Sequence, residues 1–117
     1  MDKIIIYQKP TCSTCREVFA ALREAGVDFQ AVDYYIDPIP REKLKELLSK
    51  MRLRASDLQR TYEPVYKELG LEGRIPTDEE LLDLMTKHPD LLQRPIVEHG
   101  ARAILARPAS KLKEIIG

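Results

Sequence analysis

Residues 3–34 read KIIIYQKPTCSTCREVFAALREAGVDFQAVDY and contain most of the information about the fold. Residues 3–8 include three consecutive isoleucines, typical of a strand buried on both faces, and Pro10 ends this run. From Ser13 onward, apolar residues recur at helical spacing as far as Gly26, which predicts a helix with a glycine cap. Residues 28–34 predict a second strand that pairs with the first through the helical crossover. A β-α-β unit therefore opens the chain.

The middle third of the sequence is predicted to be helical. A helix is expected from about Pro40, because the apolar residues that follow form an amphipathic stripe. Ser56 with Gln59 and Thr77 with Glu80 have capping-box spacing, which predicts that short helices begin at Ser56 and Thr77. The apolar stripe consists of Leu44, Leu47, Leu48 and Met51.

The last third predicts two short strands and a helix. Residues 95–97 and 103–105 are the strand candidates, and His99 and Gly100 between them are suited to a hairpin turn. A closing amphipathic helix is expected over the last residues. Its apolar positions are Leu112, Ile115 and Ile116.

This order of elements predicts an α/β protein with a thioredoxin-like fold. A small mixed four-stranded sheet is expected to be flanked by helices, with a helical insertion at about residues 38–93 between the β-α-β and β-β-α halves. The chain has 117 residues, which suits one compact domain spanning residues 1–117.

The composition excludes several classes of protein. The chain carries 19 Lys and Arg against 19 Asp and Glu, a balance that argues against the broad basic face needed for non-specific nucleic-acid binding. The N-terminal apolar run is too short for a signal peptide, and no stretch approaches the roughly 20 apolar residues of a membrane span. A cytoplasmic location is expected. In that reducing compartment, a pair of cysteines separated by two residues suggests catalysis or metal binding.

Cys12 and Cys15 are the candidate catalytic residues. At the N-cap of the first helix, the Cys12 sulfur would face unpaired N–H groups and the positive end of the helix dipole, both of which favour the thiolate. Cys15 would lie one turn further on, close enough to attack an adduct or mixed disulfide on Cys12. Arg16 adds positive charge near the sulfur, although it also fits the role of an ordinary solvated helix residue.

Two other interpretations of the cysteine pair compete with redox chemistry. Half of a zinc site is one, but His88 and His99 are far downstream and there are only two cysteines, so we expect no metal site. Two inert core thiols are the other, since cysteine is often buried. The position of the pair between a strand-ending proline and a helix start favours redox chemistry.

Three further arginines are candidate ligands for an anion. Arg94 precedes Pro95, and a cis proline at this point of a thioredoxin-like fold would bring Arg94 to the sulfur. Arg60 is predicted to end a short helix, and Arg107 precedes Pro108 after the last strand candidate. Each alone is most often a solvated surface charge. If they converge near a thiolate, they form a fork-shaped site for a tetrahedral oxyanion.

Three stretches resemble the glutaredoxin-like arsenate reductase family, which also contains the Spx-type transcription regulators, and the resemblance covers nearly the whole chain. It implies that Cys12 attacks arsenate and that Arg60, Arg94 and Arg107 hold its oxygens. It implies no bound cofactor, but a reducing thiol such as glutathione, glutaredoxin or thioredoxin as co-substrate. The stretches are Tyr7-x-x-Pro10-x-Cys12-x-x-Cys15-Arg16, Leu58-Gln59-Arg60, and His88-Pro89-x-Leu91-Leu92-x-Arg94-Pro95-Ile96-Val97.

Departures from the family pattern keep other functions open. The glutathione-dependent reductases usually have serine in place of Cys15 and histidine in place of Gln8. The Spx regulators carry the C-x-x-C pair as an oxidation sensor on a protein that binds RNA polymerase, but they generally lack the equivalent of Arg107. A reductase is therefore the preferred interpretation. A redox-sensing regulator and a general thiol-disulfide oxidoreductase are the alternatives, and a monomer is expected.

Overall fold

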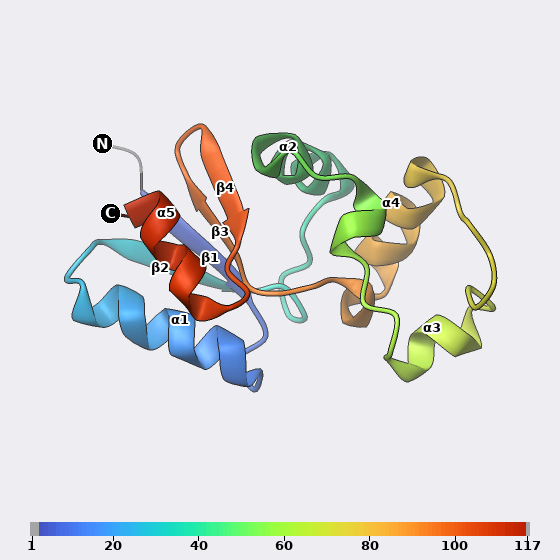
Figure 1. The fold of residues 1–117 in the computed structure, drawn as a ribbon, viewed down its shortest axis with the longest axis horizontal. Coiled ribbons are helices and arrows are strands. Elements are labelled where there is room, and N and C mark those ends of the chain that lie inside the picture. The colour runs from blue at the N-terminus through green and yellow to red at the C-terminus, as the bar shows by residue number, and fades with distance from the viewer. Residues whose placement is uncertain (1–2, 117) are drawn as a thin grey trace. The chain divides into compact units, whose positions relative to one another are not determined.

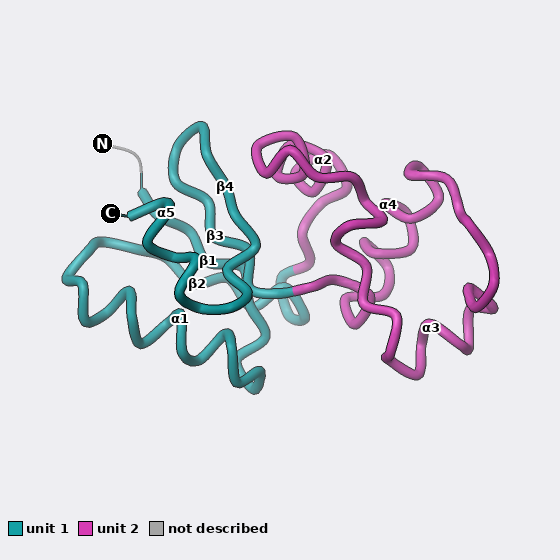
Figure 2. The backbone as a smooth tube through the Cα atoms, viewed as in Figure 1, with its two compact units in different colours: residues 1–37, 94–117 teal, residues 38–93 magenta. Residues whose placement is uncertain are grey.

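The structure is a computed structural model that describes residues 3–116. The chain forms two compact units, shown in Figure 2. Residues 1–37 with residues 94–117 make up the first, which we call the sheet unit, and residues 38–93 make up the helical unit. The helical unit thus spans the same residues as the predicted insertion, while the assignment of one domain to the whole chain stays a prediction.

The sheet unit is built on four strands in the order β2-β1-β3-β4 (Figure 1). Strand β1 pairs in parallel with β2 and antiparallel with β3, and β3 pairs antiparallel with β4. The small mixed four-stranded sheet is therefore confirmed. The strands are β1 Ile4–Gln8, β2 Phe29–Asp33, β3 Ile96–His99 and β4 Arg102–Leu105.

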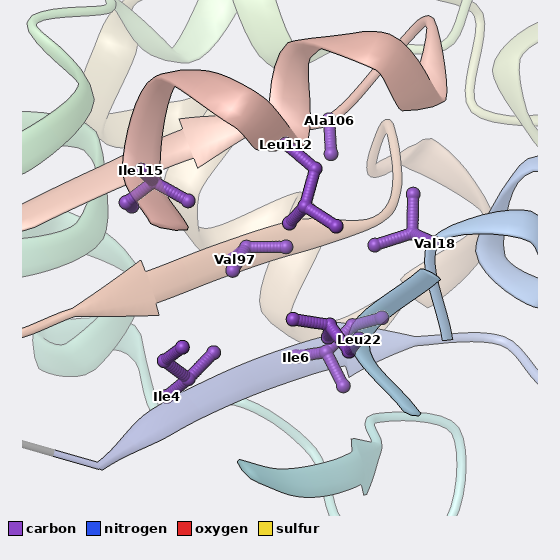
Figure 3. Close-up of a cluster of buried hydrophobic side chains, with 8 residues drawn as sticks. All are labelled: Ile4, Ile6, Val18, Leu22, Val97, Ala106, Leu112 and Ile115. Atoms are coloured by element: carbon purple, nitrogen blue, oxygen red, sulfur yellow. The ribbon is translucent and has the colours of Figure 1, made fainter. Parts of the chain in front are cut away.

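Two helices close one face of this sheet. Helix α1, Ser13–Glu24, connects the parallel strands, and helix α5, Lys113–Ile116, follows the 3₁₀ helix η3, Ala109–Leu112. Figure 3 shows the core between them and the strands, where two alternate residues of β1 and Val97 of β3 meet side chains of the helices. This packing fixes the direction in which α1 leaves β1. The core consists of Ile4, Ile6, Val18, Leu22, Val97, Ala106, Leu112 and Ile115.

The hairpin turn between β3 and β4 lies one residue further along than predicted. His99 still pairs with Arg102 across the hairpin, so the turn is formed by Gly100 and Ala101. Gly100 has a φ of 64°, in the left-handed region that glycine adopts without steric cost. The predicted turn at His99 and Gly100 was therefore wrong by one position, because the ladder uses His99 as its last pair.

The helical unit contains three α-helices and two 3₁₀ helices among the residues that the structure describes. The cap predicted at Thr77 is confirmed, since its Oγ1 accepts a hydrogen bond from the Glu80 N–H at 3.1 Å. The helix start predicted at Ser56 was wrong. The helix there begins at Ala55, and the Asp57 side chain accepts from the Arg54 N–H at 2.8 Å. The elements are α2 Arg41–Met51, η1 Ala55–Leu58, α3 Pro64–Glu68, α4 Asp78–Lys87 and η2 Pro89–Leu91.

Candidate functional site

Cys12 is the N-cap residue of α1. Its backbone is extended, its N–H donates to the Lys9 carbonyl at 2.9 Å, and its carbonyl accepts from the Arg16 N–H at 3.0 Å. The loop from the end of β1 is thus tied into the first turn of the helix. The half-buried sulfur lies at the positive end of the helix dipole, near backbone N–H groups that have no partner within the helix.

The surroundings of the sulfur favour the thiolate. Partial burial works against the charge, but hydrogen bonds from the backbone and side chain of Cys15, together with Arg94, lower the pKa of Cys12 to about 7. The other thiol behaves in the opposite way. Burial and the neighbouring Cys12 raise the pKa of Cys15 to about 12. At neutral pH the thiolate of the pair is therefore Cys12, and Cys15 is a buried thiol that donates a hydrogen bond to it.

Two predicted arginines meet at this sulfur. The Arg107 Nη1 lies 4.0 Å from the Cys12 Sγ and donates to the carbonyl oxygen of Arg94 at 3.0 Å. The Arg94 side chain hydrogen-bonds to the Cys12 sulfur and is only 5% exposed. The peptide bonds that precede Pro95 and Pro108 are both cis.

The strand register explains this meeting. Ile96 pairs with Leu105, so extending the β3–β4 ladder by two residues places Arg94 opposite Arg107. Ile96 also pairs with Tyr7, and the same extension along β1 reaches the loop that leads to Cys12. The sheet itself therefore brings both guanidinium groups to the edge where α1 begins.

The other two candidate arginines, Arg60 and Arg16, have different neighbours. Arg60 lies in the helical unit, two residues after η1 rather than at its end, where its N–H donates to the Leu91 carbonyl at 2.7 Å. Its Nε and Nη2 donate to Glu63 at 3.2 and 3.0 Å, and its Nη1 donates to Gln93 at 3.3 Å. A role for Arg60 at the sulfur stays a prediction. Arg16 is exposed on the first turn of α1, where it lines a hollow of about 620 Å³.

Sequence reasoning missed a group of residues that surround Arg94. The Arg94 Nη1 donates to the hydroxyl of Tyr35 at 3.3 Å, and the Lys9 Nζ lies 4.9 Å from the centre of the Tyr35 ring. Tyr34 is a further hydrogen-bond partner of Arg94. The positions of the two tyrosines could have been inferred from the sheet topology. Both tyrosines directly follow a strand parallel to β1, and loops at the carboxyl ends of parallel strands share one edge of the sheet.

Neither a metal centre nor a membrane segment is found in the part of the chain that the structure describes. Within residues 3–116, no group of three or more His, Cys, Asp and Glu side chains could hold a metal ion. Over the same residues, no helix has the length and apolar character needed to cross a membrane.

A lowered pKa makes the reactivity of Cys12 dependent on pH near neutrality. Only the thiolate reacts with iodoacetamide, so the alkylation rate should rise through a midpoint at about pH 7, whereas an ordinary thiol has a pKa near 9.0. Below the midpoint the rate should fall about tenfold for each pH unit. Mass spectrometry of the modified peptides would assign the reaction to Cys12 or Cys15. A midpoint above pH 8.5 would contradict the described site.

Known proteins are similar to this chain in architecture and sequence. The family model described as the ArsC family matches residues 7–115. An arsenate reductase from Acidiphilium multivorum is 34% identical over 116 residues, covering 99% of this chain and 82% of that protein. The uncharacterized protein YfgD of Escherichia coli is 35% identical, covering 98% of each chain. A solved structure of an arsenate reductase from Vibrio cholerae superposes with a TM-score of 0.91 at 34% identity, covering 98% of each chain.

These similarities confirm the thioredoxin-like fold and extend across both units of the structure. The matched residues include the whole arrangement at the sheet edge, from Cys12 and Cys15 to Arg94 and Arg107. Because the family model covers nearly the entire sequence, and relatives at 34% and 35% identity are covered to 82% and 98% of their lengths, the chain belongs to the ArsC family.

Proposed function

We propose that this protein is a thiol-dependent oxidoreductase that reduces arsenate to arsenite, with Cys12 as the nucleophile. The observation that carries the proposal is the position of the Cys12 sulfur, at a helix N-terminus and beside the guanidinium groups of Arg94 and Arg107. A thiolate in this setting is an active nucleophile at neutral pH. The arginines would hold a tetrahedral oxyanion against it. The relatives named arsenate reductase support this substrate.

The first step joins sulfur to arsenic. The Cys12 thiolate attacks the As(V) centre, an S–As bond forms, and one oxygen of the arsenate takes up protons and leaves as water. Negative charge remains on the other oxygens during this exchange. Arg94 and Arg107 would stabilise that charge through fixed, charge-assisted hydrogen bonds, and Arg60 is proposed to assist them.

The second step transfers two electrons to arsenic. A second thiol attacks the Cys12 sulfur, the S–As bond breaks, and its electron pair leaves with arsenic as As(III), so that arsenite departs and a disulfide remains. The second thiol is either Cys15, one helical turn away, or an external thiol such as glutathione. If Cys15 is the second thiol, two external thiol groups, from glutathione with glutaredoxin or from thioredoxin, then reduce the Cys12–Cys15 disulfide. If an external thiol has attacked, one further thiol releases Cys12 from the mixed disulfide. Over the whole cycle, one arsenate and two thiols yield one arsenite, one disulfide and one water.

A coupled assay tests this proposal. The purified protein would be given arsenate with glutathione, glutaredoxin and glutathione reductase, or with thioredoxin and thioredoxin reductase, while NADPH consumption is followed. We expect arsenate-dependent oxidation of NADPH with at least one system, in proportion to the arsenite formed. If neither system consumes NADPH with arsenate, but a small disulfide substrate is reduced, the protein is a general thiol-disulfide oxidoreductase. If neither substrate is reduced and RNA polymerase co-purifies, the regulator alternative is favoured.

A further inference from the structure

The segment that follows β2 is a compact turn attached to the sheet edge. The side chain of Asp33 accepts a hydrogen bond from the Tyr35 N–H at 3.0 Å, and its carbonyl accepts from the N–H groups of Ile36 and Asp37 at 3.1 and 2.9 Å. Asp33 itself pairs with Gln8 in the parallel ladder. The last pair of this ladder therefore fixes the position of the turn relative to the loop that leads to Cys12.

This turn presents two tyrosine side chains to Arg94. The rings of Tyr34 and Tyr35 lie 5.1 Å apart and are tilted by 33°. Tyr35 accepts a hydrogen bond from the Arg94 Nη1 at 3.3 Å, and Tyr34 is a second partner of the same guanidinium. The Lys9 ammonium lies 4.9 Å from the centre of the Tyr35 ring, a cation–π contact that ties this ring to the loop before Cys12.

The chemical nature of these partners matters for the charge of Arg94. Burial works against the positive charge of Arg94, but a guanidinium stays a cation at neutral pH, where the two tyrosine hydroxyls are neutral. A neutral hydroxyl can fix the direction of a guanidinium without neutralising it. Arg60 differs in this respect, because its partner Glu63 is a carboxylate at 3.0 Å. The hydroxyls of Tyr34 and Tyr35 can therefore orient the Arg94 guanidinium and leave its charge in place.

We propose that Tyr35, together with Tyr34, is a positioning residue that holds the Arg94 guanidinium beside the Cys12 sulfur. Free rotation of a long arginine side chain would otherwise reduce the fraction of time that its charge spends near the sulfur. The tyrosines act through Arg94 alone. The charged and titratable groups that face the sulfur are Cys15 from α1, Arg94 from the segment before β3 and Arg107 from the segment after β4.

The test uses Tyr35→Phe, Tyr34→Phe and the double variant, each of which removes a hydroxyl and keeps the ring. The alkylation rate of Cys12 by iodoacetamide is measured against pH. We expect the midpoint to move upward, with the rate at pH 6.5 falling at least about twofold in Tyr35→Phe and further in the double variant. Tyr66→Phe, a tyrosine of α3 in the helical unit, is the control and should leave the curve unchanged.

A double-mutant cycle separates action through Arg94 from a general structural effect. In an Arg94→Ala background, Tyr35→Phe should produce no further change in the midpoint. An equal shift in both backgrounds, or an unchanged midpoint in the double tyrosine variant, would overturn the proposal. Because Tyr35 is only half-buried and the ring is retained, Tyr35→Phe is expected to fold normally, which thermal melting would check.

A second measurement rests on the proposed function. Arsenate should protect Cys12 from alkylation, and the arsenate concentration for half-protection should be several times higher in the double tyrosine variant than in the wild-type protein. If arsenate does not protect the wild-type protein, the proposed function fails. The midpoint measurement still decides the role of the tyrosines in that case, because it needs no substrate.

Discussion

Replacing Cys12 by serine is expected to reduce arsenate-dependent turnover by at least about a thousandfold, because the variant lacks the atom that bonds to arsenic. A serine hydroxyl is not ionised at neutral pH, so neither the helix N-terminus nor the arginines can convert it into a comparable nucleophile. The coupled NADPH assay, with arsenite measured directly, would quantify the loss. Turnover close to the wild-type rate would exclude Cys12 as the nucleophile.

The same substitution should leave the fold intact. Cys12 is the N-cap residue of α1 and makes no side-chain hydrogen bond to the helix, whereas serine is among the favoured N-cap residues. The melting temperature of Cys12→Ser should therefore equal or exceed that of the wild-type protein. Loss of activity without loss of stability is the signature of a chemical role, and a large fall in melting temperature would leave the activity result attributable to unfolding instead.

Cys15→Ser is the matched comparison, since it changes the other sulfur of the pair. Arsenate should still protect Cys12 from alkylation in this variant, because the first step needs only the Cys12 thiolate. The midpoint of Cys12 alkylation should stay near pH 7, since a serine hydroxyl at this position can also donate a hydrogen bond to the thiolate. Turnover with glutathione should persist if an external thiol completes the reaction, and should disappear if Cys15 is the second thiol.

The location of the sulfur could be predicted from local sequence because it depends on short-range features. A strand, a proline and an amphipathic helix within about 20 residues place Cys12 at a helix start, and the structure has it there. Arg94 and Arg107 were harder to place, since their meeting depends on pairing between distant strands. The predicted hairpin nevertheless had Arg94 before its first strand and Arg107 after its second, which indicated that the two side chains could lie close together.

Other features of the structure could not be predicted from sequence patterns. The strand predicted over residues 28–34 included Tyr34, whereas β2 ends at Asp33 and the turn that follows brings Tyr34 and Tyr35 to Arg94. The helix start near residue 55 was misplaced because Asp57, rather than Ser56, supplies the capping oxygen. The ion pair between Arg60 and Glu63 was not predicted either, because sequence spacing alone did not indicate that these two side chains bind each other.

Replacing Arg94 by alanine is expected to weaken arsenate binding by about 1.5 to 3 kcal/mol, or roughly 10- to 150-fold, if its hydrogen bonds to the anion are charge-assisted. The half-protection concentration of arsenate in the alkylation assay would measure the loss. Arg94→Lys keeps a positive charge but not the fork of donors, so it should recover only part of the affinity. Arg23→Ala, in the last turn of α1, is the control and should bind arsenate normally.

Arg94→Ala should also raise the pKa of Cys12, because the arginine is one of the groups that lower it to about 7. The thiolate fraction of Cys12 at pH 7 then falls. At pH 9.5 the Cys12 thiol should be largely ionised in both the wild-type protein and Arg94→Ala, and the two should be alkylated at similar rates. The loss of arsenate affinity should persist at that higher pH, since it reflects missing donors rather than missing thiolate. A defect that vanished completely at pH 9.5 would mean that Arg94 acts only on the ionisation of the sulfur, and would remove it from the oxyanion site.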